Sequence, residues 1–161
     1  MIELREDDPR APHVAALLAF HRKDAQADSP PEFRHSLDAD GLSAACVTFW
    51  TAWHDGALAG LCALKDLGEG AGEVKSMRTA PGQLRRGVGR AMLAHVMETA
   101  RARGYRRLYL ETGTSSAFAA ASRLYEAAGF VDGPVFGGYP PSPHNRFMTI
   151  SLEGSPCPPS S

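Results

Sequence analysis

The stretch Met77–Met92, MRTAPGQLRRGVGRAM, carries the most information in this chain of 161 residues. A short β-like run ends at a Pro-Gly turn, and two arginines then lead into Gly87-Val88-Gly89. An amphipathic helix is predicted to begin directly afterwards, with no side chain placed to cap it. Free backbone N–H groups, the positive end of a helix and arginine side chains therefore meet at one point. The stretch predicts a site for an anion such as a pyrophosphate.

Two familiar phosphate-binding motifs fit this stretch poorly. A P-loop requires Gly-Lys-Ser/Thr at the start of the helix, where this chain has Gly89-Arg90-Ala91. A dinucleotide-binding motif requires a third Gly or Ala where Met92 stands, although Glu111 follows about where its acidic residue would be expected. Glycines that serve only a surface turn are the simpler alternative, and the flanking arginines favour the anion site.

The hydrophobic pattern predicts a sheet with helices inserted between its strands. The predicted strands cover residues 2–5, 46–53, 57–66, 73–79, 107–111, 131–139 and 147–152. Predicted helices begin near residues 7, 88 and 118, and residues 32–42 form a less regular segment. Short turns at 54–56 and 68–72 make three consecutive strands antiparallel. Gly104 and Gly129 are expected to end the second and third helices.

Composition indicates a single soluble domain over residues 1–152, with a frayed Pro- and Ser-rich tail at 153–161. The formal net charge of −1 argues against a nucleic-acid-binding surface, while arginines gather between positions 78 and 107. Three scattered cysteines and the lack of a metal-binding motif predict a cytoplasmic protein without disulfides or a metal. The first residues are unlike a signal peptide, and no apolar run is long enough to span a membrane.

A second motif supports the first. Residues Leu124–Phe130 read Leu-Tyr-Glu-Ala-Ala-Gly-Phe, and the earlier stretch combines Thr79-Ala80-Pro81 with Gly87-Val88-Gly89. In this order and spacing, over about residues 73–130, the chain resembles the GCN5-related N-acetyltransferase (GNAT) family. The resemblance implies an α/β (α+β) fold with a mixed, mostly antiparallel central sheet flanked by helices. It also implies a splay between the two central strands, 73–79 and 107–111.

The same resemblance implies acetyl-coenzyme A (acetyl-CoA) as the acetyl donor. Its pyrophosphate would lie on the backbone N–H groups of residues 85–90, and its pantetheine arm would pair with the backbone around Met77 and Thr79. The cofactor-binding residues implied are Met77, Arg78, Thr79, Leu84, Arg85, Arg86, Gly87, Val88, Gly89, Arg90, Phe118 and Tyr125. Leu84 stands where the family usually has Arg or Gln, Arg85 where Gly is frequent, and Phe118 where many members have Asn.

Three residues are candidates for the chemistry. Tyr125 matches the family's tyrosine that can protonate the departing thiolate, and a core tyrosine is the alternative. Glu73 is the first candidate for a base acting through water, with a solvent-facing residue at a strand start as the alternative. Glu111 ends the neighbouring strand and could equally line the pocket. The backbone N–H near Met77 is a candidate oxyanion donor.

The resemblance therefore predicts an N-acetyltransferase that acts on a primary amine, with a small molecule as the acceptor. Residues 32–42 and 133–146 would form the acceptor side, and terminal strands that pair between chains would make a homodimer. A catalytically silent acyl-CoA-binding or sensing domain is the main alternative, because the Arg/Gln and Asn contacts are missing. A nucleotide-binding protein of the Rossmann type is a third hypothesis.

Overall fold

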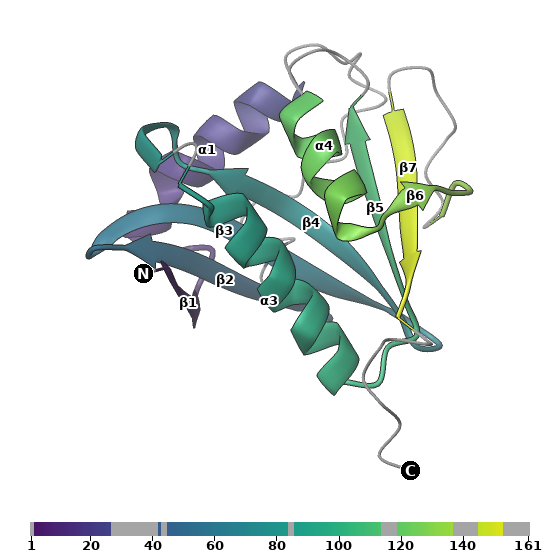
Figure 1. Ribbon diagram of the computed structural model, residues 1–161. Coiled ribbons are helices and arrows are strands. Elements are labelled where there is room, and N and C mark those ends of the chain that lie inside the picture. Colours follow the sequence, from purple (N-terminus) through teal and green to yellow (C-terminus); the bar gives the residue numbers. More distant parts are fainter. Residues whose placement is uncertain are drawn as a thin grey trace.

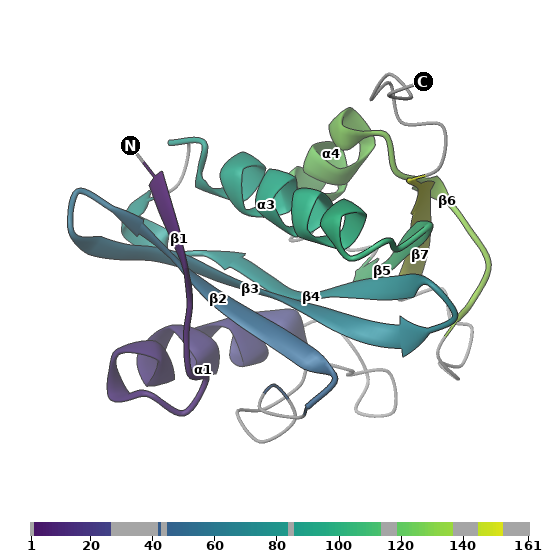
Figure 2. The same cartoon turned by 90° about the horizontal axis from the view of Figure 1, so that it is seen from below.

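The computed structural model describes residues 2–26, 42, 45–83, 86–113, 119–136 and 145–152. These residues form a seven-stranded sheet in the order β1-β2-β3-β4-β5-β7-β6. The strands are β1 (Ile2–Glu6), β2 (Val47–His54), β3 (Ala57–Gly68), β4 (Ala71–Thr79), β5 (Arg107–Gly113), β6 (Val131–Asp132) and β7 (Asn145–Ser151). The helices are α1 (Pro12–Gln26), α3 (Val88–Ala102) and α4 (Ala119–Ala128), with a 3-10 turn, η2, at Pro81–Gln83. Helices α3 and α4 cover one face of the sheet and α1 the other (Figures 1 and 2).

Two tight turns produce the predicted antiparallel run from β2 to β4. Asp55 and Gly56 have φ angles of 51° and 80°, and Glu69 and Gly70 have φ angles of 57° and 79°. Such left-handed pairs match the twist of a hairpin. The second turn is shorter than predicted, because Gly72 pairs within β4. A Cβ at Gly72 would lie 2.8 Å from the Tyr105 ring, so this glycine makes room for an aromatic side chain.

The central strands separate as the resemblance implies. Strands β4 and β5 run parallel and pair only from Ala71 opposite Arg107 to Val74 opposite Leu110. Beyond these pairs β4 continues to Thr79 and β5 to Gly113. The other described strand pairs are antiparallel. The predicted fold class, a mixed and mostly antiparallel sheet with a central splay, is therefore confirmed, and Figure 1 shows the two strands diverging.

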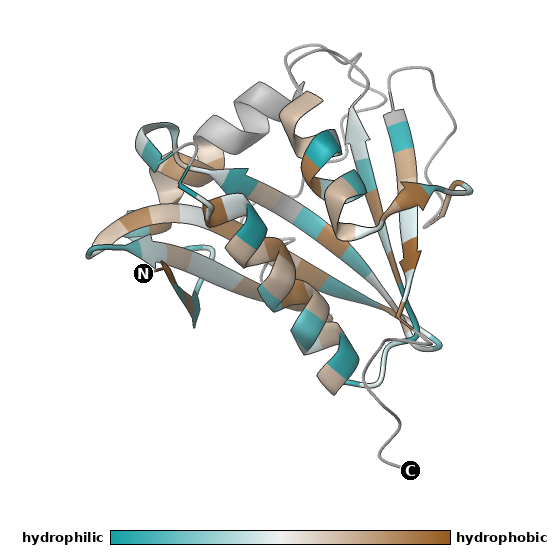
Figure 3. Cartoon of the chain, in the orientation of Figure 1, coloured by the Kyte–Doolittle hydropathy of each residue, from teal (hydrophilic) through white to brown (hydrophobic). Residues whose placement is uncertain are grey.

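Apolar side chains fill both sides of the sheet. Helix α3 is amphipathic, as the alternation of teal and brown along it in Figure 3 shows. Its buried residues are Val88, Met92, Leu93, Val96, Met97 and Ala100. On the opposite face, α1 packs Val14, Leu17 and Leu18 into a separate cluster with residues of β2 and β3. The two layers hold the sheet between helices and fix where α3 begins.

Helices α3 and α4 end in the same way, as predicted. Gly104 has a φ of 81°, and the Tyr105 N–H donates to the Ala100 carbonyl at 2.9 Å. Gly129 has a φ of 107°, and the Phe130 N–H donates to the Tyr125 carbonyl at 3.0 Å. This bond from C″ to C3 closes a helix on a left-handed residue. The last turn of α4 therefore fixes Tyr125 through its own backbone carbonyl.

Two predicted elements have other bounds. Helix α1 begins at Pro12 rather than near residue 7, and β6 covers two residues rather than 131–139. The irregular segment 32–41 and the tail 153–161 lie outside the described residues. No helix in the described part of the chain is long and apolar enough to cross a membrane.

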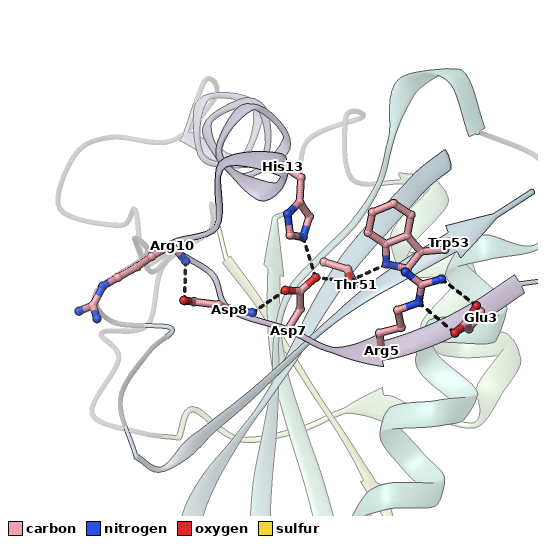
Figure 4. Close-up of polar contacts among 8 residues, drawn as sticks. All are labelled: Glu3, Arg5, Asp7, Asp8, Arg10, His13, Thr51 and Trp53. Carbon is pink, nitrogen blue, oxygen red and sulfur yellow. Dashed lines mark hydrogen bonds and ion pairs between the residues drawn. The ribbon is translucent and has the colours of Figure 1, made fainter. Parts of the chain in front are cut away.

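Asp7 is not a helix start, because a polar network uses its carboxylate (Figure 4). Asp7 Oδ2 accepts hydrogen bonds from Thr51 Oγ1 at 2.7 Å and from His13 Nε2 at 2.8 Å. Asp7 Oδ1 accepts the Asp8 N–H at 2.8 Å, and Trp53 Nε1 donates to Thr51 Oγ1 at 2.8 Å. Burial opposes ionisation, but these bonds outweigh it and hold the pKa of Asp7 below its ordinary value. The network ties β1 and α1 to β2.

Replacing Thr51 with valine is expected to lower the free energy of unfolding by about 2 kcal/mol. The Thr51 side chain is fully buried, and its hydroxyl both donates to Asp7 and accepts from Trp53. Chemical denaturation of the variant measures the loss. Thr48→Val is the matched control, because the Thr48 hydroxyl on the same strand makes an exposed bond with Arg103. Equal losses in both variants would contradict a special role for the network.

The same network has a defined pH dependence. Because the folded pKa of Asp7 is lowered, its contribution to stability is fully present above the ordinary carboxylate pKa. That contribution disappears as the pH falls through the folded pKa. The difference between the wild type and Thr51→Val should therefore shrink at strongly acid pH.

Candidate functional site

The start of α3 leaves backbone N–H groups that have no hydrogen-bond partner among the described residues. Gly87 is the N-cap residue, with a φ of 81° and no side-chain cap. Helical hydrogen bonding begins with the Ala91 N–H, which donates to the Gly87 carbonyl at 3.0 Å. The N–H groups of residues 88–90 therefore precede the bonded part of the helix. Nothing in the described part of the chain lies within 4 Å of where a Gly87 Cβ would be.

Gly89 brings three segments together at this point. A Cβ at Gly89 would lie 3.1 Å from Leu124 Cδ2 of α4 and 3.7 Å from Thr79 Oγ1 at the end of β4. The first turn of α3 therefore lies next to the end of β4 and next to Leu124 of the second motif. The residues present fit a pyrophosphate, because a helix N-terminus without a cap binds anions through its N–H groups. The cofactor-binding roles of Thr79, Gly87, Val88 and Gly89 stay predictions.

Positive side chains surround the same point. Arg86 and Arg90 are exposed beside the helix start, and Arg78 is half-buried near the end of β4. The charge of Arg78 acts on Tyr125, where it favours the ionised phenol. The predicted positions Leu84, Arg85 and Phe118 lie outside the described residues. Their contacts with the cofactor therefore stay predictions.

Tyr125 is buried near this site, and no polar partner for it occurs among the described residues. Its side chain is 8 % exposed and contacts the Phe130 ring edge-on, with centroids 5.9 Å apart. Among the described residues, its hydroxyl makes no hydrogen bond. Burial is the main cause that raises the pKa of Tyr125 to about 12, so the phenol stays protonated at neutral pH. A buried hydroxyl without a partner costs about 1–3 kcal/mol, and a ligand that accepts its hydrogen bond removes that cost.

Glu73 has a neighbour that sequence analysis missed. Its side chain is 3 % exposed, and Glu73 Oε2 lies 3.0 Å from Lys75 Nζ, which is also buried. The solvent-facing alternative for Glu73 is therefore wrong. Opposite charges two residues apart on a strand share a face, and this spacing was the signal that could have revealed the pair. The role of Glu73 as a base stays a prediction, and any such role involves the ammonium of Lys75.

Aromatic side chains gather on the β5–β7 part of the sheet, where β5 still pairs with β4. Tyr109 lies two residues before the predicted Glu111, and its ring centroid is 5.0 Å from that of Phe136. Phe136 in turn meets the Phe147 ring edge-on at 5.8 Å. Glu111 is half-buried and lies opposite Phe147 in the register of β5 and β7. The sequence did not single out these rings, because strands far apart in the chain bring them together.

The remaining predicted contact is Met77. Its side chain is half-buried and packs against the core cluster beneath α3. Its backbone lies in the part of β4 beyond the last pair with β5, so it can face a ligand within the splay. Cys62, in contrast, is unsuited to carry an acyl group, because burial raises the pKa of its thiol to about 12. No group of three potential metal ligands occurs among the described residues.

Comparison with known proteins agrees with this geometry. The model of a protein family described as "Acetyltransferase (GNAT) family" matches residues 11–130. A protein of Escherichia coli K12 named uncharacterized N-acetyltransferase YedL is 45 % identical over 152 residues, which are 94 % of this chain and 96 % of that protein. A protein of Bacillus subtilis 168 named uncharacterized N-acetyltransferase YsnE is 41 % identical over 94 % of this chain and its own full length.

A solved structure shares the fold. The GNAT family acetyltransferase from Elizabethkingia anophelis, with acetyl-CoA bound, superposes with a TM-score of 0.68 at 18 % identity. The match covers 94 % of this chain and 98 % of that one. At this level of identity the likeness concerns the fold alone. Because the family match spans both motifs and the relatives are similar over nearly their whole lengths, the chain belongs to the acetyltransferase (GNAT) family and is an acyltransferase.

Proposed function

We propose that this chain transfers an acetyl group from acetyl-CoA to a primary amine of a small molecule. The observation that carries the proposal is the uncapped start of α3, where Gly89 lies between the end of β4 and α4. An acetyl-CoA pyrophosphate on the N–H groups of residues 88–90 satisfies these donors. The acetyl-CoA bound to the structure from Elizabethkingia anophelis supports the choice of donor.

The splay between β4 and β5 supplies the place for the pantetheine arm. Pairing of the two strands ends at Val74 and Leu110, so β4 continues from Lys75 to Thr79 beyond its last pair with β5. An extended arm with amide groups can pair with this part of β4 as a strand would. The same part of β4 leads from the start of α3 into the sheet. A donor held at both places presents its thioester within the opening.

The proposed reaction is a direct attack by the amine. The amine nitrogen forms a bond to the thioester carbonyl carbon, the carbon–sulfur bond breaks, and the electron pair leaves with sulfur. The Tyr125 hydroxyl donates its hydrogen bond to the departing sulfur, which develops negative charge. Glu73 or Glu111 takes the proton that the attacking nitrogen loses, directly or through water. The backbone N–H near Met77 stabilises the carbonyl oxygen as charge develops on it.

A two-part assay tests this function. Acetyl-CoA at about 100 times its dissociation constant should stabilise the fold by about 2.7 kcal/mol, while NAD should leave the melting temperature unchanged. Release of free CoA thiol is then measured across a panel of small primary amines. Binding with no thiol release above the rate without enzyme would instead favour the silent acyl-CoA-binding domain. No stabilisation by acetyl-CoA would overturn the proposal.

A further inference from the structure

A second polar pocket lies at the opposite end of β4 from the start of α3. The β3–β4 turn, residues 67–71, forms one wall, and Arg106, Arg107 and Tyr109 form the other. The pocket has a volume of about 390 Å³, within the range of small-molecule sites. Ala71 lines the pocket and Thr79 lies beside Gly89, so about 26 Å of β4 separates the two places at ~3.3 Å per residue. Figure 1 shows the β3–β4 turn beside the start of β5, the two segments that supply these residues.

Backbone hydrogen bonds fix both walls of this pocket. The Gly70 carbonyl accepts the N–H groups of Arg106 at 2.7 Å and Arg107 at 3.4 Å. The Leu152 N–H donates to the Arg106 carbonyl at 2.8 Å. A Cβ at Gly70 would lie 3.2 Å from Arg106 Nε, so the turn approaches this side chain closely. The pocket is therefore built before any ligand arrives.

Among the described residues, each of the two guanidinium groups makes one hydrogen bond. Arg106 Nη2 donates to the Glu69 carbonyl at 3.3 Å, and Arg107 Nη1 donates to Thr149 Oγ1 at 3.0 Å. Each guanidinium has five N–H donors, so several remain on each. Neither arginine forms an ion pair with any residue that the structure describes. Thr149 Oγ1 itself donates to the Leu108 carbonyl at 2.9 Å, which orients it as an acceptor for Arg107.

Charge decides what the pocket can hold. Two positive side chains line it, and the exposed carboxylate of Glu69 is the acidic group among its lining residues. We propose that this pocket binds an oxyanion of a small metabolite, a carboxylate or a phosphate group. The fork of a guanidinium matches two oxygens of either group with charge-assisted hydrogen bonds. The proposal is independent of the acetyl-CoA site, because the two places share no residue.

Amide chemical shifts of the labelled protein test the proposal, since they report on each end of β4 separately. Citrate and inorganic phosphate are titrated in separate arms at constant ionic strength and pH. We expect saturable shifts of the Gly68 and Gly70 amides, and the arm with the higher affinity identifies the source of the oxyanion. Shifts confined to Gly87 and Gly89 would place the anion only at α3 and would overturn the proposal.

Three charge variants provide the decisive comparison. Arg107→Gln should weaken binding about tenfold, and Glu69→Gln should tighten it severalfold by removing the opposing charge. Arg123→Gln is the matched control, because this exposed arginine on α4 carries the same charge and does not line the pocket. If Arg107→Gln does not fold, Arg106→Gln takes its place. Equal affinities in the wild type and in all charge variants would overturn the assignment.

Discussion

Gly87→Asp is expected to lower the affinity for acetyl-CoA about 100-fold, which corresponds to about 3 kcal/mol. The variant places a carboxylate in front of the first N–H groups of α3, where the pyrophosphate is proposed to lie. Two like charges about 4 Å apart repel by several kcal/mol when they are partly shielded from water. A Cβ at Gly87 would have no described atom within 4 Å, so that atom adds no clash with the described residues. Calorimetric titration with acetyl-CoA measures the effect.

Gly87→Asn is the control that separates charge from backbone strain. The φ of 81° at Gly87 is unfavourable for most side chains, but asparagine adopts this region more readily than others. It has the shape of aspartate without the charge. The Asn variant should bind acetyl-CoA within a few-fold of the wild type. If both variants lose affinity equally, the backbone conformation of Gly87 matters and the pyrophosphate does not contact this turn.

Tyr125→Phe is expected to lower kcat about 100-fold with little change in KM, because the hydroxyl acts on the departing sulfur. The same substitution should leave the free energy of unfolding unchanged or raise it by about 1 kcal/mol. The reason is that the hydroxyl is buried without a partner among the described residues, so its loss removes a cost. A tyrosine with a purely structural role would give the opposite pair of results. Steady-state kinetics and chemical denaturation decide between them.

The pH dependence sharpens this test. With a pKa of about 12, Tyr125 stays protonated throughout the range in which an amine acceptor titrates. The ratio of wild-type kcat to that of Tyr125→Phe should therefore stay constant between about pH 7 and pH 10. A ratio that falls toward alkaline pH would mean that the phenol ionises in the complex. In that case the charge of Arg78, which lowers the pKa of Tyr125, would have outweighed its burial.

Local patterns made much of this fold predictable. The turn at Asp55-Gly56 and the helix ends at Gly104 and Gly129 follow from single residues with a left-handed backbone. The features that the sequence could not show depend on residues that are far apart in the chain. Asp7 resembles a helix start, but its carboxylate bonds to Thr51, which lies 44 residues away in the chain. Tertiary contacts therefore overrode a local capping signal.

The site divides in the same way. The start of α3 was predictable, because an uncapped helix after Gly87-Val88-Gly89 is a local feature. The ion pair between Glu73 and Lys75 and the buried hydroxyl of Tyr125 depend on which faces the fold covers. Hydropathy cannot reveal a hydroxyl that lacks a partner, since this needs every neighbour in three dimensions. The family resemblance pointed to Tyr125, and the structure supplies the physical reason to test this residue.

The divergence of β4 and β5 also has a mechanical consequence. Among the described residues, the β1–β4 part of the sheet pairs with the β5–β7 part through four residue pairs, from Ala71–Arg107 to Val74–Leu110. The β1–β4 and β5–β7 parts of the sheet are thus joined by few strand pairs, while the core cluster beneath α3 contains residues of both parts. A molecule bound in the splay between β4 and β5 would contact both parts and hold them together. The rigidity of the junction between the two parts would then depend on the bound molecule more than on the chain alone.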